Sequence, residues 1–329
     1  MSKQRTIIWI DDEPNRIRTA NLLAETSSIP VCFENVKNKD LGEAVNRLLE
    51  GPQPALVVLD HILDQASSGN PMFRRGSTIA QAVKEQWPTC PVIGVTNIDR
   101  LQEIDIRTRG TYDDLYPLVH FGKYMDRIDS VARDFAKVAR SKPISVLDII
   151  KLLRAPNDDI SSLEAALPQD LKEMPEDGSV ASRLYRWVKL LLRGRPGFLY
   201  DAVWSATFLG LNQKGFSIVQ KRFGKAMYKG VFAVESESRW WKSALSDTLY
   251  EMCPPATGEL TWHVGRRLPR ISPEHFSKCY VCDGEYPDIV AFLDAASDEQ
   301  RPMHSSCTVL HPNFKRELYF EDIRIMRGE

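Results

Sequence analysis

The chain has 329 residues, with 43 Lys and Arg against 44 Asp and Glu, a formal net charge of −1 and 43% hydrophobic residues. These values are close to the average of soluble globular proteins and exclude a wholly disordered chain, a collagen-like chain and a disulfide-dense mini-protein. At roughly 100–200 residues per domain, the length allows two or three domains.

The start of the chain indicates its compartment. The sequence turns acidic at Asp11 before any signal-peptide core could form, and no run approaches the roughly 20 apolar residues of a membrane span. We therefore expect a cytoplasmic protein with no membrane insertion. Thiols stay reduced in that compartment, so the six cysteines are expected to be thiols or metal ligands rather than disulfides.

The first 142 residues alternate short apolar runs with amphipathic stretches, which is typical of a parallel sheet covered by helices. The runs predict strands over residues 6–10, 55–59, 91–95 and 116–121, and the amphipathic stretches predict helices over 15–25, 41–49, 78–87 and 127–140. The pattern predicts an α/β domain with a doubly wound, five-stranded parallel sheet.

Polar side chains follow the predicted strands at the points where the strands end. They are Asp11, Asp12, Asp60, Thr96 and Lys123. The carboxyl ends of parallel strands meet in one crevice, where three carboxylates repel one another unless a hard cation such as Mg²⁺ lies between them. A hydroxyl and an ammonium beside them can hold phosphoryl oxygens. The set predicts an aspartate that accepts a phosphoryl group with the help of Mg²⁺.

These residues give the first 140 or so residues a resemblance to the receiver domain of bacterial two-component response regulators. Asp11 and Asp12 in WIDDEP match the family's acidic pair, and Asp60 in LVVLDHIL matches its phosphoacceptor. Thr96 in VIGVTN matches the switch hydroxyl, and Lys123 in VHFGKYM matches the lysine. The resemblance implies a sensor histidine kinase or another phosphodonor as partner, and a switch relayed to an unknown protein effector.

Three positions depart from the family pattern. The loop DQASSGNPMFRR between Asp60 and Gly76 is enlarged and lacks the usual proline soon after the aspartate. Lys123 precedes Tyr124, where the family usually has proline. The aromatic residue of the last strand is either Tyr116 or His120.

Residues 143–262 predict a mainly helical output region that begins after Pro143, with helices over 144–153, 162–166, 198–209 and 215–228. Its charge is strongly uneven: residues 144–182 hold three basic and eight acidic residues, whereas residues 183–229 hold ten basic residues and one acidic residue. Two helical faces carry the basic side chains that could contact nucleic acid or an acidic protein: Arg183, Arg186, Lys189, Arg193, Lys221, Arg222 and Lys225. Alternatively, these faces meet the acidic segments of the same molecule.

Residues 263–329 contain two close pairs of metal-ligand residues. Cys279 and Cys282 form a C-x-x-C pair, and His304 and Cys307 follow after 21 residues. Pairs joined by a loop of that size build tetrahedral Zn²⁺ sites, and a complete Cys₃His set favours a structural ion because it leaves no open position. His311 is an alternative ligand to His304. We predict a small α+β module stabilised by zinc.

Three functions remain open. The first is a response-regulator-like signalling protein phosphorylated on Asp60, a phosphoryl acceptor rather than a turnover enzyme. The second is a scaffold or nucleic-acid-binding module whose receiver serves for protein recognition. The third is an output region with nuclease activity, for which the sequence around His304 and His311 supplies no clear motif.

Overall fold

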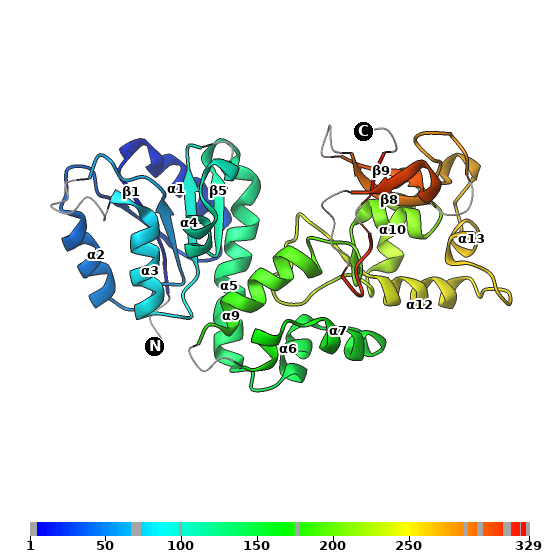
Figure 1. Ribbon diagram of the computed structural model, residues 1–329, viewed down its shortest axis with the longest axis horizontal. Coiled ribbons are helices and arrows are strands. Elements are labelled where there is room, and N and C mark those ends of the chain that lie inside the picture. Colours follow the sequence, from blue (N-terminus) through cyan, green and yellow to red (C-terminus); the bar gives the residue numbers. More distant parts are fainter. Residues whose placement is uncertain are drawn as a thin grey trace. The chain divides into compact units, whose positions relative to one another are not determined.

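The computed structural model describes residues 5–66, 74–98, 101–174, 178–285, 289–294, 299–311, 317–322 and 324–326. The chain forms two compact units (Figure 1). The first unit contains residues 1–146, 169–186 and 234–236, and the second contains the remainder. The predicted boundaries at 142 and 262 stay predictions.

A five-stranded parallel sheet forms the centre of the first unit. Its strands are β1 (Ile7–Asp11), β2 (Val31–Asn35), β3 (Leu56–Asp60), β4 (Val92–Thr96) and β5 (Asp114–Pro117). Their order is β2-β1-β3-β4-β5, a doubly wound arrangement with a switch point between β1 and β3. The predicted fold class of this segment is confirmed.

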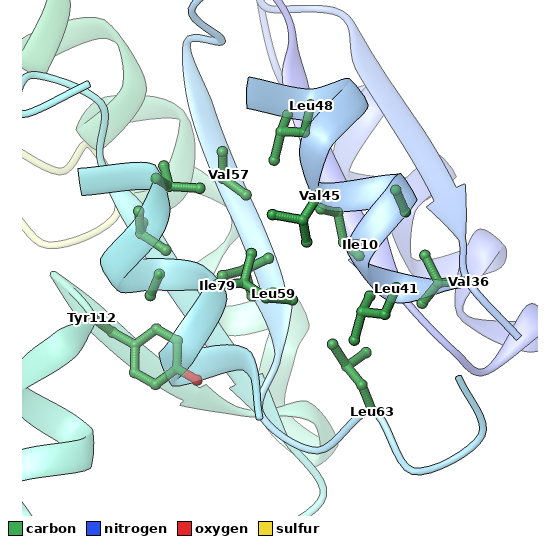
Figure 2. Close-up of a cluster of buried hydrophobic side chains, with 14 of the residues drawn as sticks. Ile10, Val36, Leu41, Val45, Leu48, Val57, Leu59, Leu63, Ile79 and Tyr112 are labelled. Carbon is green, nitrogen blue, oxygen red and sulfur yellow. The ribbon is translucent and has the colours of Figure 1, made fainter. Parts of the chain in front are cut away.

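Helices cover the sheet because each presents an apolar stripe to it. They are α1 (Ile17–Thr26), α2 (Leu41–Glu50), α3 (Gly76–Gln86), α4 (Ile106–Thr111) and α5 (Met125–Ser141). Figure 2 shows one layer of this core, in which Val45 of α2 and Ile79 of α3 pack with Val57 and Leu59 of β3. All four side chains are at most 4% exposed, so this layer is a rigid support for the strand ends.

The last strand differs from the prediction. A strand over 116–121 is wrong: β5 ends at Pro117, and residues Leu118–Tyr124 form a 3₁₀ helix. Pro117 has no N–H to donate to a sheet ladder, which favours a strand end at this point. The strand β2 was not predicted, because this edge strand is half-exposed and has no continuous apolar run.

Segments outside the predicted receiver complete the first unit. They include α8 (Gln169–Lys172) and the part of α9 (Val180–Trp187) that precedes Trp187. The Tyr185 hydroxyl of α9 donates to Asp114 Oδ2 of β5 at 2.7 Å, and the Tyr116 hydroxyl donates to the same oxygen at 2.5 Å. All three side chains are buried, so this segment packs on β5 as part of the unit.

The second unit is mainly helical with short two-stranded sheets. Its helices are α6 (Val146–Leu153), α7 (Ile160–Ala166), a π-helix (Val188–Leu192), α10 (Ala202–Phe208), α11 (Gln213–Val219), α12 (Lys242–Met252) and α13 (Thr261–Gly265). Its strands are β6 (Leu199–Tyr200), β7 (Trp240–Trp241), β8 (Ile289–Asp294), β9 (Glu299–His304), β10 (Thr308–Leu310) and β11 (Arg324–Met326). Short 3₁₀ helices lie at 157–159, 220–223, 273–275 and 305–307 in this unit, and at 14–16 and 101–103 in the first unit.

Two helices predicted for this region are shorter in the structure. The predicted helix 198–209 begins with β6 and continues as α10, because the Asp201 carboxylate accepts from Trp204 N and caps the helix there. The predicted helix 215–228 ends at Val219 and continues only as a 3₁₀ turn to Phe223. Within the described part of the chain, none of the helices is long and apolar enough to cross a membrane.

Candidate functional site

Three aspartates meet at the carboxyl end of the sheet. Asp11 is the last residue of β1, Asp12 follows it, and Asp60 is the last residue of β3. One carboxylate oxygen from each lies within 4.8 Å of the others, and all three side chains are buried. The structure therefore brings the predicted acidic residues together at the switch point of the sheet.

Hydrogen bonds fix the orientation of each carboxylate. Asp11 Oδ1 accepts from Glu13 N at 2.9 Å, and Asp11 Oδ2 accepts from the Trp9 indole at 3.3 Å. Asp12 Oδ2 accepts from Gln65 N at 2.5 Å, and Asp60 Oδ1 accepts from Ile62 N at 3.3 Å. Three of these four donors are backbone amides of the loops that follow β1 and β3, so these loops hold the carboxylates in place.

The carboxyl groups share an unfavourable electrostatic environment. Burial, together with the charge of Asp11, raises the pKa of Asp60 to about 8. Burial raises the pKa of Asp11 to about 6 and also raises the pKa of Asp12. Three buried carboxyls that resist ionisation, with oxygen as the only donor atom, fit a hard divalent cation that would neutralise them.

A cavity of about 240 Å³ adjoins the acids. Asp12, Asp60 and Thr96 line it, together with Asn97 and Ile98, which follow β4. The Thr96 side chain is 1% exposed and its hydroxyl accepts from Ile98 N at 3.2 Å, so its proton can point to an oxygen in the cavity. The cavity places a hydroxyl donor beside the carboxylate of Asp60.

A glycine allows α3 to begin against the end of β3. A Cβ atom at Gly76 would lie 2.1 Å from the backbone carbonyl oxygen of Asp60, so no other residue fits there. The helix predicted over 78–87 therefore begins two residues earlier, at Gly76, and ends at Gln86. Residues 67–73 of the enlarged loop before it lie outside the described residues.

Lys123 lies on the 3₁₀ helix that follows β5, and its side chain is exposed. Within the described residues, it forms no ion pair with an acidic group, and it does not line the cavity. Phe121, two residues earlier, packs its ring on Trp9 with centroids 4.9 Å apart, which holds the middle of this helix near β1. The structure brings Asp11, Asp12, Asp60 and Thr96 together but leaves Lys123 facing solvent.

Sequence reasoning did not identify Arg16, whose guanidinium contacts two residues of the same cavity. Its guanidinium donates to Asn97 Oδ1 at 2.5 Å and forms an ion pair with Glu13 Oε2 at 3.1 Å. Both partners line the cavity. The available signal was its position four residues after Asp12, where Pro14 starts a short 3₁₀ turn that directs it back toward the strand ends.

The second candidate site is the group Cys279, Cys282, His304 and Cys307, in which one ligand atom of each lies within 4.8 Å of the others. Cys282 Sγ is 3.2 Å from His304 Nδ1, and His304 N donates to Cys279 Sγ at 3.4 Å. A Cβ at Gly284 would lie 3.3 Å from Cys282 Sγ and 3.1 Å from His304 Cε1, so a glycine lets the loop close on the group. His304 rather than His311 joins the cysteines.

The environment of Cys279 favours its thiolate. Burial acts against ionisation, but backbone N–H groups of Cys282, His304 and Val281 lower the pKa of the Cys279 thiol below its ordinary value. The Nε2 atom of His304 is buried and has no hydrogen-bond partner within the described residues. Four sulfur and nitrogen donors around one point fit a single tetrahedral ion, whose ligand atoms lie roughly 3.5 Å apart.

The basic residues named from the sequence divide into two sets. Arg183 contacts Asp170 at 3.7 Å, Arg186 donates to the backbone oxygen of Gly110 at 2.8 Å, and Arg193 pairs with Glu237 at 2.8 Å. These three arginines make contacts within their own unit, and Lys189 is half-buried with a partner of its own. The three cations of the 220–225 segment are exposed, with no ion pair within the described residues: Lys221, Arg222 and Lys225.

Comparison with known proteins gives matches among solved structures. No protein-family model matches the sequence. No curated protein matches it either.

Solved structures that match include a CheY-like receiver domain protein from Methanospirillum hungatei (15% identity, 41% of this chain, 98% of that chain, TM-score 0.32). The response regulator TrrA from Thermotoga maritima, in complex with Mg²⁺-BeF, matches at 17% identity over 38% of this chain and 96% of that chain, with a TM-score of 0.30. The receiver domain of NtrX from Brucella abortus matches at 18% identity over the same shares, also with a TM-score of 0.30.

Proposed function

We propose that this chain, whose first part has the fold of a response-regulator receiver domain, is a signalling protein that accepts a phosphoryl group on Asp60. The observation that carries the proposal is the meeting of Asp11, Asp12 and Asp60 at the ends of β1 and β3, with Thr96 lining the adjoining cavity. The donor would be a sensor histidine kinase or a small phosphodonor, and a protein effector would read the modified state.

The residues of the chain divide the chemistry between them. An oxygen of the Asp60 carboxylate attacks the phosphorus of the donor, the bond from phosphorus to the donor's bridging atom breaks, and the donor leaves with that electron pair. The Thr96 hydroxyl donates to an oxygen of the transferred group. Asp11 and Asp12 would hold Mg²⁺ with Asp60, and this ion supplies charge neutralisation for the anionic phosphoryl group.

Labelling from a small phosphodonor tests this function. The full chain incubated with acetyl phosphate and Mg²⁺ should gain one base-labile, hydroxylamine-sensitive phosphoryl group, measured by intact mass, and should gain none without Mg²⁺. Asp60→Asn should remain unlabelled, whereas Asp126→Asn, a change of an exposed aspartate on α5, should be labelled. Equal labelling of wild type and Asp60→Asn would refute the assignment.

We also propose that Cys279, Cys282, His304 and Cys307 hold a structural Zn²⁺ in the second unit. The support is the closed Cys₃His donor set, the thiolate-favouring amides at Cys279 and the glycine that lets the loop close. A set without an open position stabilises the fold rather than catalysing a reaction.

Metal analysis tests the zinc site. Purified protein should contain one zinc per chain, and Cys282→Ser should lose most of it. Cys253→Ser changes a half-buried cysteine outside the group and should leave the zinc content unchanged. A zinc content far below one in the wild type would refute the proposal.

A second candidate function is contact with nucleic acid through Lys221, Arg222 and Lys225. The observation that favours it is the exposure of these cations in a segment with no acidic residue between Asp201 and Glu235. If they bind phosphates, changing all three to Gln should weaken binding to DNA or RNA and reduce the slope of log affinity against log salt by about one for each cation that contacts a phosphate. Neutralising the exposed Lys37 and Arg107 of the first unit should change neither, and an unchanged slope in the triple variant would exclude this surface.

A further inference from the structure

A cavity of about 200 Å³ in the second unit takes no part in the sites described above. A cavity of about 150 Å³ is large enough to hold benzene, so this one has room for a ring compound somewhat larger than benzene. Its wall comes from α10, α13, β8 and the segment before Cys279. The wall combines apolar side chains with hydroxyl groups: Phe208, Trp262 and Ile289, and Thr207, Thr261 and Ser277.

The loop that carries the C-x-x-C pair forms one side of this cavity. Ser277 and Glu285 lie on either side of the pair in the sequence, and both line the cavity. The backbone N–H of Cys279 donates to Gly284 O at 2.8 Å, which closes the loop between them. The N–H of Ser277 donates to Gly210 O at 3.0 Å, which ties the loop to the end of α10. Backbone hydrogen bonds therefore fix this wall.

The two charged residues of the wall, Arg266 and Glu285, compensate each other. The Arg266 guanidinium packs over the rings of Trp262 and Phe276, 4.9 Å and 4.5 Å from their centroids. Its Nε donates to Gly210 O at 3.3 Å, and its NH2 group donates to the backbone oxygen of Glu285 at 3.0 Å. The Glu285 carboxylate lies 3.7 Å from the same guanidinium. A wall whose charges are paired in this way favours an uncharged ligand.

The hydroxyl groups of the wall retain hydrogen-bonding capacity. Ser277 is 1% exposed, and within the described residues its buried Oγ has no hydrogen-bond partner. Thr207 Oγ1 donates to Val203 O at 2.9 Å, and Thr261 Oγ1 shares a hydrogen bond of 3.1 Å with the Tyr250 hydroxyl. Each of these oxygens can still accept a hydrogen bond, because a hydroxyl has one donor and two acceptor positions. A buried hydroxyl without a partner is costly, and a polar ligand in the cavity would satisfy Ser277.

We propose that this cavity binds a nucleobase, which is an uncharged planar ring with donors and acceptors on its edge. The aromatic and aliphatic side chains of the wall suit the faces of the ring, and the hydroxyl groups suit its edge. The volume suits one base rather than a whole nucleotide, and the paired charges favour a neutral ring. A free base, a nucleoside and an unstacked base of a nucleic-acid strand all present this chemistry. The site is separate from Asp60 and does not depend on phosphoryl transfer there.

Titration calorimetry of the full chain with adenine, hypoxanthine, cytosine and uracil tests the ligand class. At least one base should bind with a Kd below about 1 mM, a modest affinity for a ligand of about ten non-hydrogen atoms. Toluene lacks a polar edge and benzoate carries a negative charge, so both should bind more weakly than the best base. Failure of all four bases to bind would overturn the proposal, and so would toluene or benzoate binding as tightly as the best base.

Two serine variants locate the bound base. Ser277→Ala should weaken binding of the best base by about 3- to 10-fold, the usual effect of losing one hydrogen bond. Ser205→Ala is the matched control, because Ser205 is also fully buried with an Oγ that has no partner within the described residues, but it does not line the cavity. Each variant removes an unsatisfied hydroxyl, so neither should lower the melting temperature of the ligand-free chain. Unchanged affinity in Ser277→Ala would show that the base binds elsewhere and would overturn the proposal.

Further titrations distinguish the sources of the ring. The nucleoside of the preferred base and a short single-stranded DNA rich in that base are compared in wild type and Ser277→Ala. Tighter binding of the nucleoside, weakened in Ser277→Ala, supports a free small molecule as the ligand. Tighter binding of the strand, weakened in the same variant, supports an unstacked base of a nucleic acid. If Ser277→Ala binds both as tightly as wild type does, neither ligand uses this cavity and the proposal fails.

Discussion

Single residues explain both what the sequence predicted at the site of the three aspartates and what it missed. Asp11, Asp60 and Thr96 follow from apolar runs that end in a polar residue, a signal that depends only on neighbours in the chain. Arg16 depends on a turn of the chain and on a contact with Asn97, 81 residues away. A spacing pattern carries no information about a contact of that kind.

The carboxyls of Asp60 and Asp11 should make the free energy of unfolding depend on pH. Burial raises the pKa of Asp60 from 3.8 to about 8 and that of Asp11 to about 6. Above about pH 4, the folded chain therefore keeps protons on these carboxyls that the unfolded chain has released. Their contribution to the free energy of unfolding is fully present below about pH 4. It decreases as pH rises to about 8, by up to about 1.4 kcal/mol per pH unit for each proton.

We expect Asp60→Asn to remove the part of this decrease that comes from Asp60. In Mg²⁺-free buffer, the variant should be more stable than wild type by about 2–4 kcal/mol at pH 8 and by less at pH 5. Hydrogen exchange of the β1 and β3 amides in urea at both pH values measures this difference. The exposed Asp126→Asn should follow wild type, and a difference that is equal at both pH values would contradict the prediction.

At the scale of elements, the central strands and long helices of the first unit were predictable from the sequence. The edge strand β2, the end of β5 and the packing of α9 on β5 were not. Strands β1, β3 and β4 are apolar runs buried on both faces, and α5 shows a continuous apolar stripe over four turns. The end of β5 depends on Pro117 and on the packing of Tyr116 against other elements, which an apolar run does not reveal. The packing of α9 on β5 depends on a buried carboxylate that accepts two hydroxyl donors.

We expect the hydrogen bond between Tyr185 and Asp114 to hold α9 on the first unit. Tyr185→Phe keeps the ring that packs against Phe135 of α5 but leaves a buried carboxylate with one donor fewer, which costs about 1–3 kcal/mol. Hydrogen exchange of the α9 amides should become about 5- to 100-fold faster. Tyr124→Phe is the matched control, because the Tyr124 ring stacks on Tyr116 while its hydroxyl makes no hydrogen bond within the described residues. Similar exchange of α9 in both variants would show that ring packing alone retains this helix.

At the scale of the whole molecule, the two candidate metal sites lie in different compact units. The three aspartates belong to the first unit, and the Cys/His group belongs to the second. Their chemistry also differs, since oxygen donors suit Mg²⁺ and thiolates suit Zn²⁺. The net charge of −1 and the count of six cysteines do not indicate this division. It follows only from the positions of the aspartates and cysteines in the chain.

Separate units with separate metals should respond independently to metal removal. A zinc-selective chelator in excess Mg²⁺ should destabilise the segment around residues 279–307, because a structural zinc site contributes its binding free energy to folding. Hydrogen exchange should rise there, while the rate of Asp60 labelling by acetyl phosphate stays within about twofold. Conversely, Asp11→Asn should weaken Mg²⁺-dependent labelling and leave one zinc per chain. A parallel fall of Asp60 labelling with zinc loss would contradict this independence and would show that the Cys/His group also supports the site of the three aspartates.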